Sequence, residues 1–130
     1  MRVLIVDDVP AVREALRLLL DDEPGVLVVG EAGDGEEALR LVDTLRPDVV
    51  LMDLDMPHLG GLPATRALTS RPNPPRVVAM NVYGADDAIR RLALEAGAAT
   101  YVEKGASLEE VVTALRAALT GGAAPTSLIP

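Results

Sequence analysis

Three aspartates and one lysine stand out in this 130-residue chain because each lies at the end of a short apolar run. Asp7 and Asp8 follow the first run, Asp53 ends the third, and Lys104, the only lysine in the chain, comes just after the fifth. Carboxylates held close together repel one another, and a hard divalent cation relieves that repulsion. A nearby lysine can neutralise a phosphoryl oxygen or pair with an aspartate. These residue types predict a divalent-cation and phosphoryl site wherever the fold brings them together.

The elements that must position these residues begin with five apolar runs rich in Val, Leu and Ile. The runs cover residues 2–6, 26–31, 48–53, 76–80 and 99–102. Runs of this length without clean alternation are typical of strands buried on both faces, as in a parallel sheet.

Helical patterns follow each run. Four show apolar residues at helical spacing: Val12, Ala15, Leu16 and Leu19; Ala38, Leu41, Val42 and Leu45; Ile89, Leu92, Ala93 and Ala96; and Leu108, Val111, Val112, Leu115 and Leu119. Ser107 and Glu110 form a capping box before the last of them. The remaining segment, 62–70, is the weakest pattern and carries Pro63 in its first turn, where proline is tolerated. Five strand–helix units in alternation predict an α/β fold with a parallel sheet and helices on both faces.

Such a sheet would gather the chemistry at one edge, because ligands of open parallel sheets bind beyond the carboxyl ends of the strands. Asn81 follows the fourth run and joins the acids and Lys104 at this edge. Any one of the acids alone could be a helix cap or a loop residue. Their coincidence at four strand ends favours a functional site.

Charge and composition narrow the classes of function. The chain has 12 Lys and Arg against 20 Asp and Glu, which gives a net charge of −8. That balance argues against nucleic-acid or anionic-membrane binding, since both need a basic surface. The chain has no cysteine, so a metal would be held by oxygen or by His58.

The ends of the chain carry further expectations. The first residues lack the pattern of a signal peptide and no membrane-length apolar stretch follows, which predicts a cytoplasmic protein. Residues 121–130 contain Gly and Pro without periodicity and are expected to form a linker or a disordered tail after a single domain of residues 1–120.

Three segments together resemble the receiver domain of two-component response regulators. They are Ile5-Val6-Asp7-Asp8, residues 48–57 followed by Gly60-Gly61, and Tyr101-Val102-Glu103-Lys104. Residues 29–39 look most like receivers of the NarL/FixJ type, which usually precede a DNA-binding domain. The resemblance implies a flavodoxin-like, doubly wound (βα)₅ fold with strand order 2-1-3-4-5.

The resemblance also implies the chemistry of the site. Asp53 would be the phosphoacceptor, taking its phosphoryl group from a sensor histidine kinase or a small acyl phosphate. Asp8 would bind Mg²⁺ directly, Asp7 mainly through water, and Asp53 and the backbone carbonyl of Asp55 would complete the metal site. Lys104 would contact the phosphoryl group.

Loop shape, catalysis and partners follow from the same resemblance. Pro57 and Gly61 would shape the loop after the acceptor. Such a domain catalyses only its own phosphorylation and dephosphorylation, so it is not expected to be an enzyme. DNA contact would come only through an output domain that is not in this chain.

Two residues depart from the pattern of the family. Asn81 stands where Ser or Thr is usual, and Val82 replaces a small residue that leaves room for the phosphoryl group. An amide can still donate a hydrogen bond to that group, although it has no hydroxyl proton. Tyr101 matches an aromatic switch position, with plain packing as the other interpretation. These residues predict that phosphorylation persists while its coupling to the surface of the fourth helix is weakened or altered.

Two other functions stay open at this point. The first is a receiver that works without phosphate, as a protein-interaction module. The second comes from Asp53-Leu54-Asp55, which matches the nucleophile motif of haloacid-dehalogenase-type phosphatases. In those enzymes the motif lies on the first strand, whereas here an acid pair precedes it. That order argues against the phosphatase.

A homodimer is a further expectation. Small and apolar residues flank the stripes of the first and last helices: Ala11, Ala15, Leu18, Ala114 and Ala118. Such residues are usually the margin of a core, but in some receivers these helices form a dimer face.

Overall fold

The computed structural model describes residues 1–56, 58–81 and 87–120, in which strands and helices alternate. The elements are β1 (Arg2–Val6), α1 (Pro10–Asp21), β2 (Leu27–Ala32), α2 (Gly35–Leu45), β3 (Val49–Asp53), α3 (Gly61–Thr69), β4 (Arg76–Asn81), α4 (Asp87–Glu95), β5 (Thr100–Glu103) and α5 (Leu108–Thr120). The strands pair in parallel in the order β2-β1-β3-β4-β5. The flavodoxin-like α/β fold is therefore confirmed.

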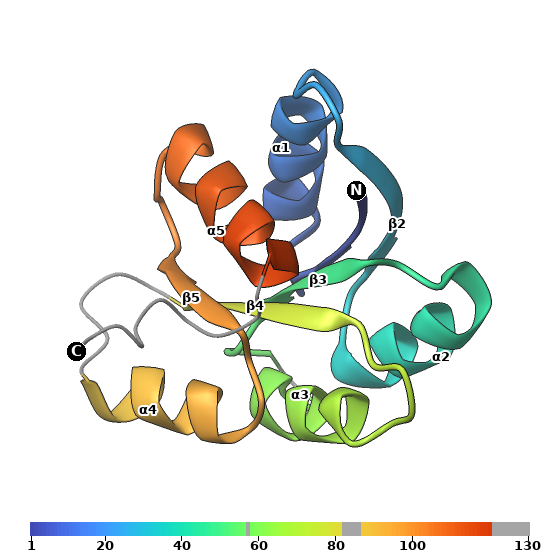
Figure 1. The fold of residues 1–130 in the computed structure, drawn as a ribbon, viewed down its shortest axis with the longest axis vertical. Helices are drawn as coiled ribbons and strands as arrows, with labels where there is room; N and C mark the ends of the chain where they lie inside the picture. The colour runs from blue at the N-terminus through green and yellow to red at the C-terminus, as the bar shows by residue number, and fades with distance from the viewer. Residues whose placement is uncertain (57, 82–86, 121–130) are drawn as a thin grey trace.

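The sheet is the middle layer of three (Figure 1). Helices α1 and α5 cover one face, and α2, α3 and α4 cover the other. Alternate residues of β1 point to opposite faces: Val3 and Ile5 join the core under α1 and α5, while Leu4 and Val6 join the core under α2 and α3. All four are fully buried, which explains why the strand reads as a continuous apolar run.

The predicted strands match the observed ones to within one residue at each end. The weakly patterned third helix begins at Gly61, one residue before its expected start. The predicted capping box is present, because the backbone N–H of Ser107 donates to Glu110 Oε1 at 2.9 Å and that of Glu110 donates to Ser107 Oγ at 3.1 Å.

The prediction of which side of α1 faces the core is wrong, because the helix is rotated about its axis relative to the expected apolar stripe. Leu20 is fully buried, whereas Leu19, which we expected in the core, is 49% exposed. Ala15 is exposed as well. Three consecutive leucines, 18–20, fit more than one helical register, and only the docking of the helix on the sheet selects among them.

Some predictions concern residues outside the described part of the chain. Pro57 and Val82, with their predicted roles in loop shape and switching, and the expected linker at 121–130 lie there. Among the residues that the structure does describe, no helix has both the length and the apolar character to cross a membrane.

Candidate functional site

The structure brings the three predicted aspartates together at the carboxyl edge of the sheet. Asp7 and Asp8 follow β1 directly, and Asp53 is the last residue of the neighbouring strand β3. Each offers a carboxylate oxygen, and these three atoms lie within 4.8 Å of one another. Asp7 and Asp53 are fully buried and Asp8 is partly buried. Three acids this close form an oxygen-only donor set with strong mutual repulsion.

Lys104 bridges two of the acids. Its Nζ lies 3.1 Å from Asp7 Oδ2 and 3.1 Å from Asp53 Oδ2. The residue follows β5, and its backbone N–H donates to the carbonyl oxygen of Asn81 at the end of β4. This main-chain contact fixes the point from which the lysine reaches across β4 to the acids.

Backbone N–H groups orient the two buried carboxylates. The N–H of Asp55 donates to Asp53 Oδ1 at 3.0 Å, and the N–H of Val9 donates to Asp7 Oδ1 at 2.9 Å. Apart from the ion pair with Lys104, Asp7 Oδ2 has no hydrogen-bond partner among the described residues. A buried carboxylate oxygen of this kind fits a hard cation or a water bound to one.

The electrostatics of the cluster are unbalanced. Burial, with a smaller contribution from the neighbouring charge of Asp7, raises the pKa of Asp53 to about 6, although the Asp55 N–H and Lys104 oppose the rise. Burial alone would lower the pKa of Lys104, but its hydrogen bonds and ion pairs with Asp7 and Asp53 raise that pKa above its ordinary value. Three carboxylates face one ammonium here, so the residues fit a bound Mg²⁺.

Gly61 lies under the acceptor at the start of α3. A Cβ at this position would meet the carbonyl oxygen of Asp53 at 2.2 Å and the Cα of Leu54 at 2.6 Å. No side chain fits there without a shift of the backbone. The side chain of Asp55, by contrast, is exposed to solvent.

The other residues predicted for signalling lie on the two strands beyond β3. Asn81 is 9% exposed and ends β4, where it pairs in register with Glu103 of β5. Tyr101 is half-buried on β5, and the guanidinium carbon of Arg90 lies 5.4 Å from the centroid of its ring. This is cation–π distance, so Tyr101 is packed against α4.

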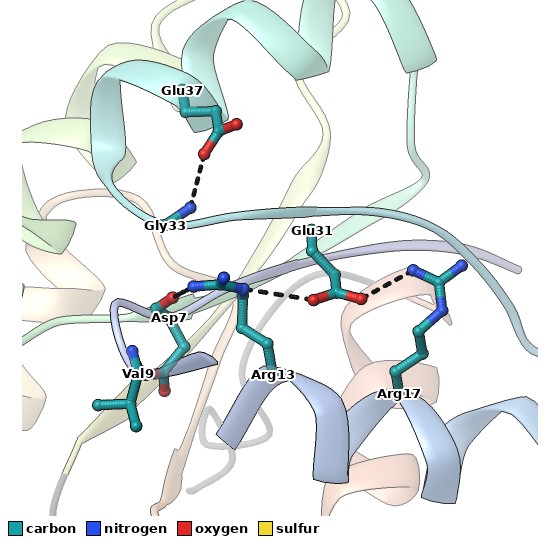
Figure 2. Close-up of polar contacts among 7 residues, drawn as sticks. All are labelled: Asp7, Val9, Arg13, Arg17, Glu31, Gly33 and Glu37. Carbon is teal, nitrogen blue, oxygen red and sulfur yellow. Dashed lines mark hydrogen bonds and ion pairs between the residues drawn. The ribbon is translucent and has the colours of Figure 1, made fainter. Parts of the chain in front are cut away.

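One group beside the site was missed from the sequence. Arg13 of α1 donates from Nη1 to the backbone carbonyl oxygen of Asp7 at 2.6 Å and pairs with Glu31 of β2 (Figure 2). The sequence did carry a signal for this contact. Arg13 is a basic residue in the helix that follows the acid pair, and Glu31 is an acid near the end of the next strand.

The fold and the acid cluster define a receiver-type domain, and comparison with known proteins agrees. The family of response regulator receiver domains matches residues 3–116. The chain therefore belongs to this family. Family membership sets aside the haloacid-dehalogenase alternative.

Individual relatives refine this assignment. The chain is 48% identical over 121 residues to the response regulator GacA of Pseudomonas viridiflava, a match that covers 93% of this chain and 56% of GacA. It thus spans about half the length of the curated relatives it matches.

Solved structures give the same result. A LuxR-family response regulator from Aurantimonas sp. SI85-9A1 is 41% identical with a TM-score of 0.87, covering 95% of this chain and 87% of that one. The receiver domain of the putative response regulator NarL from Mycobacterium tuberculosis is 37% identical with a TM-score of 0.86, covering 92% and 96%. The resemblance to NarL/FixJ-type receivers is confirmed.

Proposed function

We propose that this receiver domain accepts a phosphoryl group on Asp53 in a reaction that requires Mg²⁺. The observation that carries the proposal is the contact set of Asp53. Its buried carboxylate lies beside two further acids, and one of its oxygens is 3.1 Å from the ammonium of Lys104. Phosphoryl transfer needs mainly positioning and charge stabilisation, and this set of residues supplies both.

Three residues of the chain have separate roles in the proposed phosphoryl transfer. Asp53 is the nucleophile: a carboxylate oxygen forms the new bond to phosphorus while the bond to the donor's imidazole or acyl oxygen breaks. The N–H of Asp55 donates to the carboxylate of Asp53 and fixes its orientation. Lys104 transfers part of its interaction from Asp53 to the phosphoryl oxygens as their charge approaches.

The metal would be held by Asp7, Asp8, Asp53 and the backbone carbonyl of Asp55. When bound, Mg²⁺ supplies positive charge to the acids and to the phosphoryl oxygens. The uneven charge of the cluster supports this assignment, as does Oδ2 of Asp7, which has no partner besides Lys104 among the described residues.

Switching is proposed to depend on Asn81, Val82 and Tyr101, with Pro57 and Gly61 shaping the acceptor loop. Asn81 would donate from its amide to the phosphoryl group in place of a hydroxyl. Because an amide differs from a hydroxyl in length and donor geometry, the coupling to α4 should be altered. The presence of Asn81 in place of Ser or Thr also supports the second candidate function, a receiver that acts without phosphate as a protein-interaction module.

The relatives support two of the proposed partners, the kinase and the output domain, while the homodimer rests on the sequences of α1 and α5. We propose a sensor histidine kinase as phosphodonor, a DNA-binding output domain outside this chain, and a homodimer formed through α1 and α5. Residues 1–120 would form the receiver domain and 121–130 would lead away from it. The relatives are about twice as long as the matched region, which supports an output domain in the complete protein.

The test is phosphorylation with acetyl phosphate and Mg²⁺, read on a phosphate-affinity gel. The wild type should shift, the Asp53→Asn variant should not, and the shift should disappear with EDTA. Asp43→Asn is the matched control, because it neutralises an exposed acid on α2. Equal shifts for the wild type and Asp53→Asn would overturn the proposal.

A further inference from the structure

A row of charged side chains runs from the acid pair between α1 and β2 (Figure 2). Arg13 Nη1 donates to the carbonyl oxygen of Asp7 at 2.6 Å, and its Nε lies 3.3 Å from Glu31 Oε1. The second oxygen of Glu31 accepts from Arg17 Nη1 at 2.9 Å. The side chains of Arg13, Glu31 and Arg17 are 20%, 29% and 41% exposed, so the row is best shielded from water at the end nearest the acid pair.

Arg13 acts on the backbone of the acid pair. The carbonyl oxygen that it contacts belongs to the peptide unit joining Asp7 to Asp8, and this unit is planar. A hydrogen bond to its oxygen therefore fixes the orientation of the chain that carries both carboxylates. The N–H of Asp7 is bound to the carbonyl oxygen of Ala32 at 3.0 Å, so the turn is held from both sides.

The ion pair with Glu31 holds the guanidinium of Arg13 in its position. Glu31 pairs in register with Ile5, two positions before Asp7. In Figure 2 the guanidinium of Arg13 lies between Asp7 and the carboxylate of Glu31.

Without Glu31, the guanidinium would still lie beside the acid pair, because the carbonyl oxygen that it binds belongs to the peptide unit joining Asp7 to Asp8. Glu37, the other acid drawn nearby, is already held by the N–H of Gly33. An arginine paired with Asp8 would occupy a ligand of the cation and cancel its charge.

We infer that Glu31, held by Arg17, keeps Arg13 on the backbone of Asp7 and off the carboxylates, so that the metal site stays open to Mg²⁺. Arg13 is thus a positioning residue, and Glu31 prevents it from becoming a competitor of the metal. This inference rests on the proposed function, since it concerns the Mg²⁺ site. It predicts that Glu31 affects metal binding through Arg13 alone.

The test is a double-mutant cycle in which Mg²⁺ affinity is measured by calorimetry, because the chain has no tryptophan to report binding. The proteins are the wild type, Glu31→Gln, Arg13→Gln and the double variant, each shown to be folded by urea unfolding without metal. Asp43→Asn is the matched control, since it removes the same charge from another arginine–acid pair, Arg71–Asp43.

Glu31→Gln should weaken Mg²⁺ binding about fivefold or more in the wild-type background and less than about twofold in the Arg13→Gln background, as for residues that act through contact. Asp43→Asn should change the affinity less than about twofold. An equal effect of Glu31→Gln in both backgrounds, or no effect in either, would overturn the inference while leaving the proposed function intact. If the wild type itself does not bind Mg²⁺, the proposed function is overturned and the inference with it.

Discussion

The ammonium of Lys104 lies 3.1 Å from Oδ2 of Asp53, although 51 residues separate them in the sequence. The two residues stand at the ends of β5 and β3, with β4 between these strands. The contact spans a strand because the lysine extends over the carboxyl edge of the sheet. It joins the proposed phosphoacceptor to the elements that would carry the signal.

Asp53→Asn should stabilise the protein in the absence of metal. Burial raises the pKa of this carboxyl from 3.8 to about 6, so ionising it in the fold costs free energy. The penalty is absent below pH ~4, grows as the pH rises through ~4 to ~6, and is complete above that range, where it amounts to about 1–3 kcal/mol. The variant should therefore unfold at a higher urea concentration than the wild type at pH 8. The difference between the two unfolding midpoints should become smaller toward pH 5. A variant less stable than the wild type at pH 8 would contradict this reading of the site.

Replacing Lys104 by Gln should separate metal binding from phosphoryl transfer. Removing the ammonium takes away a cation that competes for Asp7 and Asp53, so Mg²⁺ should bind more tightly in calorimetry. The initial rate of labelling by acetyl phosphate at saturating Mg²⁺ should nevertheless fall about tenfold or more, because a charge that stabilises the transferring group is lost. Lys104→Arg, which keeps the charge, is the control. An unchanged rate in Lys104→Gln would show that the lysine does not act on the phosphoryl group.

Gly61→Ala should be strongly destabilising. The new Cβ would lie 2.2 Å from the carbonyl oxygen of Asp53, so the backbone beneath the acceptor must move. A loss of about 2 kcal/mol or more in urea unfolding is expected, in the range for overpacking at a tightly packed site. Gly60→Ala is the matched control, since a Cβ there finds its nearest neighbour at an ordinary 3.6 Å. Equal stability of the two variants would refute the steric argument.

Asn81→Thr should strengthen the response to phosphate. A hydroxyl at the end of β4 would replace the amide, and this shorter group would donate a hydroxyl proton in place of an amide proton. With beryllofluoride and Mg²⁺ as a stable mimic, the variant should form more dimer than the wild type at the same concentration, measured by light scattering. If neither protein changes mass with beryllofluoride and acetyl phosphate labels both equally, Asn81 does not control switching. The phosphate-independent function would then gain support.

The sequence predicted the fold and the acid cluster for a physical reason. Buried parallel strands have a distinctive apolar pattern, and their carboxyl ends meet at one edge of the sheet. Once the strands ending near Asp7, Asp53 and Asn81 were placed, the meeting of these residues followed from topology alone. Lys104 was predicted in the same way from the fifth strand.

What the sequence could not predict depends on side-chain packing between elements. The contact of Arg13 with Glu31 requires both the rotation of α1 and the register of β2 against β1. The rotation was the feature predicted wrongly, since Leu20 rather than Leu19 enters the core. The stacking of Arg90 on Tyr101 likewise depends on how α4 docks on β5.

The most direct test of the central claim is the position of the acyl phosphate. After incubation with acetyl phosphate and Mg²⁺, borohydride reduction converts a phosphoaspartate to homoserine, which peptide mass spectrometry can locate. The account predicts homoserine at position 53 with Mg²⁺ and none when EDTA is added. Homoserine at another aspartate instead, or at none under conditions that label a known receiver, would contradict it.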